Sequence, residues 1–78
     1  MMVVIVEPRS AWVILCNIDV EYYAIHEEDE PVECPNGHTD IVVIGRLVPV
    51  SSAVSPDDTT WETYIDNNGA TINAKRWS

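Results

Sequence analysis

The sequence predicts a small, mostly β domain built around an antiparallel sheet. Valine and isoleucine dominate the hydrophobic residues, which make up 46% of the 78-residue chain, and β-branched side chains favour strands. These residues gather in short runs separated by proline, glycine, asparagine and acidic residues, a pattern typical of strands joined by turns. The length allows one domain, residues 1–78, and a domain of this size often needs a metal ion, a disulfide or a partner for stability.

Five runs of β-branched and aromatic residues predict five strands. The first run ends at a turn in which Pro8 fixes φ. The longest run is continuous rather than alternating, which is typical of a strand covered on both faces, and Gly45 within it is expected to mark a bulge. The expected strands cover residues 2–6, 11–16, 20–25, 41–48 and 70–76. The residues expected in the core are Val4, Val6, Val13, Leu15, Ile41, Val43, Leu47 and Trp61.

The last third of the chain supports two interpretations. Residues 51–55 are expected to connect the sheet to a C-terminal segment. Ser55 followed by Pro56 is typical of a helix start, and the aromatic residues after them are spaced for one apolar helical face. The same stretch is rich in threonine, however, and Asn68-Gly69 is a strong hairpin signal. The start chemistry favours a helix near 56–67, with a hairpin as the alternative.

The charge of the chain is strongly negative and lies mainly in its first half. Thirteen acidic residues against four basic ones give a net charge of −9, and no lysine or arginine lies between Asp19 and Asp40. Such a surface repels phosphate, which argues against direct binding to nucleic acid or to an anionic membrane. No apolar run is long enough to cross a bilayer, and residues 1–6 lack the basic flank of a signal peptide. We therefore expect a cytoplasmic protein.

Two cysteines and two histidines are candidate metal ligands. The run from Cys34 to His38 places a thiolate and an imidazole four residues apart across a turn, so that both can reach one tetrahedral zinc ion. Cys16 ends an apolar strand, and Asp19 follows at the distance where the second ligand of a knuckle would stand. The candidate ligand set is Cys16, Asp19, Cys34 and His38, with His26 as an alternative fourth ligand.

The segment from Cys16 to His38 resembles the small zinc-ribbon proteins of bacteriophages. In that family a Cys-x-x-Cys knuckle, an apolar stretch and a charged loop precede a Cys-Pro-Asn-Gly-His knuckle. Residues 34–38 match the second knuckle residue for residue, whereas Asp19 replaces the second cysteine of the first. The resemblance implies a zinc-ribbon-like double knuckle with one structural zinc ion, no reaction, and a location in the cytoplasm of a bacterial host.

Other interpretations of the two cysteines stay open. The knuckles could be vestigial and hold no metal, with Cys16 acting as a small buried hydrophobic residue. A disulfide between Cys16 and Cys34 would require an oxidising compartment. Catalysis is not expected, because nothing orients His38 as a base for Cys34 and the consecutive acidic side chains diverge.

The acidic segment gives the functional expectation. Dense charge of one sign carries a self-repulsion cost, which either solubility or a basic partner would explain. We expect a phage-type interaction protein that inhibits or redirects a basic host protein or a nucleic-acid-binding enzyme, as an anti-defence mimic of nucleic acid. The alternative is a structural or accessory zinc-knuckle module without inhibitory activity. The residues expected to bind the partner are Glu27, Glu28, Asp29, Glu30 and Glu33.

Overall fold

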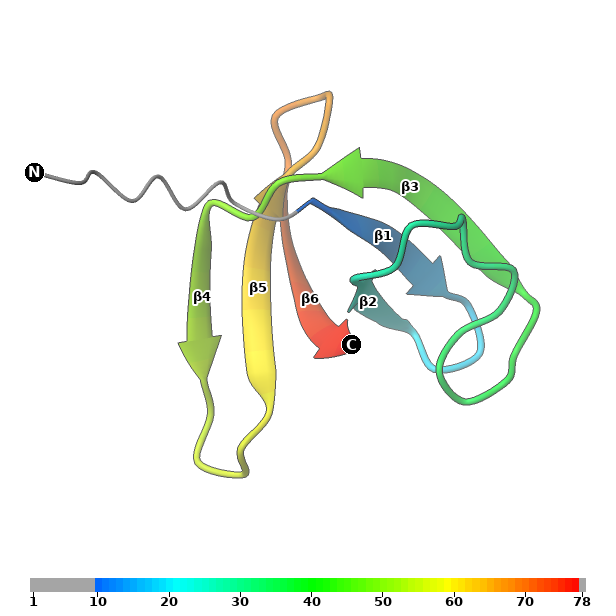
Figure 1. The fold of residues 1–78 in the computed structure, drawn as a ribbon, viewed down its shortest axis with the longest axis horizontal. Coiled ribbons are helices and arrows are strands. Elements are labelled where there is room, and N and C mark those ends of the chain that lie inside the picture. The colour runs from blue at the N-terminus through cyan, green and yellow to red at the C-terminus, as the bar shows by residue number, and fades with distance from the viewer. Residues whose placement is uncertain (1–9, 78) are drawn as a thin grey trace, which may run out of the picture.

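A computed structural model describes residues 10–77 as one six-stranded sheet, which confirms the prediction of a mostly β protein (Figure 1). The strand order is β3-β1-β2-β6-β5-β4. All neighbours are antiparallel except β2 and β6, which are parallel, so the sheet is mixed rather than purely antiparallel. The strands are β1 Ala11–Cys16, β2 Glu21–Ile25, β3 Ile41–Leu47, β4 Ser51–Val54, β5 Thr60–Ile65 and β6 Thr71–Trp77.

The first half of the sheet follows the sequence pattern closely. Strands β1, β2 and β3 correspond to the predicted runs 11–16, 20–25 and 41–48. The register between β1 and β3 shifts between Val13 and Ile14, beside Gly45, which has a φ of 148° and so marks the predicted bulge. Within residues 10–77, β3 is an edge strand with mostly half-buried side chains, which corrects the expectation of a strand covered on both faces.

The second half corrects the helix predicted near 56–67. Residues 60–65 form β5, which pairs with β6 through a turn closed by a 3.0 Å hydrogen bond from the Gly69 amide to the Asp66 carbonyl. The Ser55 hydroxyl donates to Asp57 within a turn instead of capping a helix. Threonine and aromatic residues favour the extended backbone once a hairpin partner is available, so the strand propensity prevails.

Two further expectations differ from the structure or fall outside it. Residues 51–54, expected to belong to a connector, form β4 along the free edge of β5. The predicted strand 2–6, with Val4 and Val6, lies outside the described residues.

The sheet buries side chains on both faces. The buried residues form two clusters. The partly buried Leu47 packs against the first cluster, and the partly buried Ile41 and Val43 pack against the second. Of the other predicted core residues, Val13 is fully buried, whereas Leu15 and Trp61 are half-buried. The buried residues of the first cluster are Ala11, Val13, Ala24, Tyr64, Ile72 and Ala74. Those of the second cluster are Ile14, Cys16, Tyr23, Ile25 and Cys34.

The long connection between β2 and β3 contributes Cys34 to the second cluster. Its early part is fixed by two hydrogen bonds to the carbonyl of Glu28, from Trp12 Nε1 at 3.2 Å and from Arg46 Nη1 at 3.0 Å. The Arg46 guanidinium also lies 5.7 Å from the centre of the Trp12 ring, a cation–π distance. These contacts tie the connection to β1 and β3, and thereby position the site described next.

Candidate metal centre

The structure brings together all four residues of the predicted ligand set. Cys16 ends β1, Asp19 lies in the turn before β2, and Cys34 and His38 lie in the connection between β2 and β3. Their ligand atoms all lie within 4.8 Å of one another. Both cysteines are buried and free, so the alternative disulfide is not formed. Such a group can hold a metal ion.

The second knuckle has the tight turn that its sequence predicts. The Cys34 amide donates to the His38 carbonyl at 2.8 Å, and the Gly37 amide donates to the Cys34 carbonyl at 2.8 Å. Gly37 has a φ of 85°, which favours glycine because other residues are strained there. The turn places His38 Nδ1 3.4 Å from Cys34 Sγ.

The first knuckle keeps its geometry although an aspartate stands at its second position. The backbone amide of Asp19 donates to Cys16 Sγ at 3.4 Å, which directs a partial positive charge at the sulfur. The Asp19 carboxylate reaches to 3.6 Å from Cys34 Sγ. The end of β1 and the turn that follows it therefore supply two of the four ligand atoms.

Four distances between the ligand atoms match the edges of a coordination tetrahedron. Two of them join Cys34 Sγ to His38 Nδ1 at 3.4 Å and to Asp19 Oδ2 at 3.6 Å. His38 Nδ1 lies 3.6 Å from Cys16 Sγ and 3.5 Å from Asp19 Oδ2. Around tetrahedral zinc, with bonds of about 2.3 Å to sulfur and about 2.0–2.1 Å to nitrogen or oxygen, ligand atoms lie roughly 3.4–3.8 Å apart. A direct imidazole–carboxylate hydrogen bond would be shorter, about 2.7–3.2 Å. The spacing thus fits two ligands of one ion better than a hydrogen-bonded pair.

Two neighbours hold the Asp19 carboxylate in place. Its Oδ2 accepts hydrogen bonds from Asn36 Nδ2 at 2.9 Å and from the Tyr23 hydroxyl at 3.0 Å. The Asn36 bond is the main cause that keeps the pKa of Asp19 below its usual range. The carboxylate is therefore ionised and oriented, as a metal ligand must be. The motif did not reveal these roles, since Asn36 reads as a turn residue and Tyr23 as a strand residue.

Burial opposes ionisation of one further ligand, the Cys16 thiol. Removal from water raises the pKa of the Cys16 thiol, although amides of Asp19 and Ile18 oppose that shift. Two thiolates beside the Asp19 carboxylate would place three negative charges at one partly buried point. A divalent cation compensates that charge, and its binding releases the thiol protons. The donor chemistry thus fits a thiophilic divalent metal.

His26, the alternative fourth ligand, does not belong to this group. Ile25, the last residue of β2, belongs to the second cluster, and His26 directly after it falls on the opposite face, because successive side chains of an extended backbone alternate. There its Nε2 lies 2.5 Å from Glu62 Oε1, and both side chains are only 6% exposed. The Tyr64 hydroxyl donates to the same oxygen at 3.1 Å, and among the residues that the structure describes His26 Nδ1 is buried without a hydrogen-bond partner. His26 therefore lies apart from the other candidate ligands, in a buried polar triad with Glu62 and Tyr64.

The predicted partner-binding residues are all exposed and lie on the connection between β2 and β3. We call residues 27–33 the acidic loop. Among residues 10–77, the ion pairs join His26 to Glu62, His38 to Asp19 and Lys75 to Glu21, so none of them involves this loop. The exposed residues are Glu27, Glu28, Asp29, Glu30 and Glu33.

Comparison of the chain with protein-family models, curated proteins and solved structures finds no match. Within residues 10–77 there is no helix long and apolar enough to cross a membrane. The chemistry of the site therefore rests on its own geometry.

Proposed function

We propose that the protein is a zinc-stabilised interaction module that presents an acidic loop to a basic partner protein. The observation that carries this proposal is that the loop is held at both ends while its carboxylates face solvent. One end is tied by the hydrogen bonds to the Glu28 carbonyl, and the other runs into the knuckle at Cys34. A loop that is already ordered loses less entropy when it binds.

Zinc is the proposed metal because of the ligand set. Two thiolates and an imidazole select zinc over magnesium or calcium, which prefer oxygen ligands. The four side chains would fill all four tetrahedral positions of such an ion, which supports a structural role and would leave no open position for a substrate. The ion would join the end of β1 to the connection between β2 and β3. This is the kind of cross-link that a 78-residue domain needs.

The partner is proposed to be basic because the loop offers charge without internal compensation. Among residues 10–77, no basic side chain pairs with a carboxylate of the acidic loop. Arg46 contacts the loop only through its hydrogen bond to the Glu28 backbone carbonyl, and Lys75 pairs with Glu21. An acidic surface of this kind steers a basic protein into contact and can occupy a groove that otherwise binds phosphate. A basic host protein or nucleic-acid-binding enzyme fits this description. The resemblance to phage zinc ribbons supports inhibition or redirection of such a partner in a bacterial cytoplasm.

Reversal of charge in the acidic loop tests the proposal. Replacement of Glu27, Glu30 and Glu33 by lysine is expected to slow association with the partner by about one to two orders of magnitude at low salt. Dissociation is expected to change less, and stability by no more than about 0.5 kcal/mol, since the side chains are exposed. The partner is first captured from host lysate at low salt, and both rates are then measured by surface plasmon resonance.

A matched pair of variants separates local from total charge. Changing the same three glutamates to glutamine alters the net charge by as much as placing lysines at Ser51, Ser52 and Ala53 on the exposed strand β4. Only the glutamine set is expected to slow association markedly. Unchanged association with an intact fold would contradict the proposal, and the protein would then be a structural module whose loop only aids solubility.

A further inference from the structure

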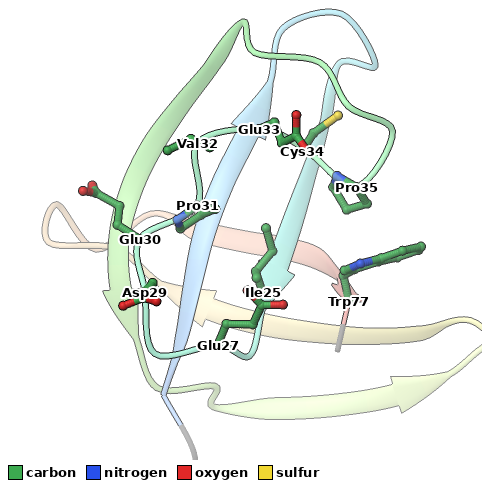
Figure 2. A pocket seen from close by; sticks show the side chains of 10 residues that line it. All are labelled: Ile25, Glu27, Asp29, Glu30, Pro31, Val32, Glu33, Cys34, Pro35 and Trp77. Carbon is green, nitrogen blue, oxygen red and sulfur yellow. The ribbon is translucent and has the colours of Figure 1, made fainter.

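A groove of about 370 Å³ lies between the acidic loop and the end of β6 (Figure 2). Its volume is at the lower end of the range of about 300–1,000 Å³ for small-ligand sites. Figure 2 shows Ile25 in the middle, Pro35 and Trp77 on one side, and Asp29 and Glu30 on the other. The groove thus has an apolar side and an acidic side.

The apolar side is built by the parallel pairing of β2 with β6. Ile25 and Trp77 are register partners, and the His26 amide donates to the Trp77 carbonyl at 3.2 Å. Ile25 is 5% exposed, whereas the larger Trp77 is 49% exposed. An exposed tryptophan beside a buried aliphatic residue is a typical anchor for a partner side chain.

The acidic side determines the chemistry of the occupant. Glu27, Asp29, Glu30 and Glu33 line the groove, and within residues 10–77 none of them is in an ion pair. A neutral apolar ligand would desolvate these carboxylates without compensation. An arginine side chain matches both sides, since its methylene stem packs on apolar surface and its guanidinium binds carboxylates and stacks on aromatic rings.

We infer that this groove binds one arginine side chain of a partner protein. The inference rests on the proposed function for the identity of the partner, and it adds a defined pocket to the general attraction of charge. Both walls are already held in place, by the Trp12 and Arg46 bonds to Glu28 and by the pairing of β6 with β2. The site therefore requires little rearrangement before an arginine enters.

The test uses N-acetyl-arginine methylamide and its neutral analogue, N-acetyl-citrulline methylamide, in NMR titrations of the full chain. The arginine compound is expected to shift the amide signals of residues 25–35 and of Trp77, and to bind at least about tenfold more tightly than the citrulline compound. Trp77→Ala is expected to weaken binding about three- to tenfold.

Two isosteric substitutions in the acidic loop provide a matched comparison that leaves Trp77 unchanged. This comparison stays valid even if Trp77→Ala fails to fold. Glu30 lines the groove and Glu28 does not, although both side chains are exposed and carry the same charge. Glu30→Gln is expected to weaken arginine binding about threefold or more, and Glu28→Gln by less than about twofold. Equal effects of the two variants, or equal binding of the arginine and citrulline compounds, would contradict the inference that the groove binds an arginine side chain.

The outcome is separable from that of the proposed function. If the arginine compound does not bind but charge reversal still slows association with the partner, the attraction between the two proteins is diffuse and electrostatic. The inference that the groove binds arginine is then wrong. If the arginine compound binds in the groove while charge reversal leaves association with the partner unchanged, the arginine site is confirmed and the proposed function is wrong.

Discussion

Replacement of Cys34 by serine is expected to lower the free energy of unfolding by at least about 3 kcal/mol. Zinc binding contributes directly to folding in small domains, and the whole stability of a chain of this length is only about 4–12 kcal/mol. A serine hydroxyl is a poor zinc ligand, so the ion and its cross-link are both lost. The corresponding fall in Tm is roughly 12–24 °C, measured by circular dichroism.

A chelator and a second substitution identify the cause of this loss. Treatment of the unmodified protein with a strong chelator is expected to bring its Tm down to that of the variant, and to leave the variant itself unchanged. Cys34→Ala, which keeps a small apolar side chain, is expected to be as damaging as serine if the metal matters. If alanine is tolerated and the chelator has no effect, Cys34 is only a buried hydrophobic residue.

Replacement of Glu62 by alanine is expected to destabilise the fold by about 3–5 kcal/mol, since removal of one member of a buried polar pair strands the other. Glu62 is 5% exposed and accepts hydrogen bonds from both His26 and Tyr64, which have no other side-chain partner in the described residues. Urea unfolding measures the change. Glu62→Gln is expected to cost less, because it keeps an acceptor oxygen in the same place.

A double-mutant cycle isolates the contact between His26 and Glu62. The loss in the double alanine variant is expected to be smaller than the sum of the two single losses by about 1–3 kcal/mol. Lys75→Ala serves as a control: its ion pair with Glu21 at 3.2 Å is partly exposed and is expected to contribute less than about 1 kcal/mol. Additive losses at positions 26 and 62 would show that the pair is not a unit.

The fold was predictable from sequence where short β-branched runs are bounded by turns. Residues 11–16 and 41–48 satisfy that condition and form β1 and β3. The run from Thr60 also fits a helix, because Ser55-Pro56 suits a helix start, and only its pairing with β6 and β4 decides for a strand. Residues 51–54 carry no strand pattern of their own, and form β4 because β5 offers a free edge.

The candidate site was predictable to the extent that it is local. The knuckle from Cys34 to His38 depends on a five-residue turn, and Asp19 follows Cys16 by three positions. The pair of His26 with Glu62, separated by 36 residues, depends instead on the order β2-β6-β5, which no short pattern encodes. Likewise, the support that Tyr23 and Asn36 give to Asp19 arises only when two loops meet.

The central claim is that Cys16, Asp19, Cys34 and His38 together hold one zinc ion. Native mass spectrometry of the protein purified without added zinc tests it most directly. The account predicts a mass increment of one zinc ion per chain, which disappears in Cys34→Ser. A chain that carries no metal, and that takes up none when zinc is added in slight excess, would contradict the claim.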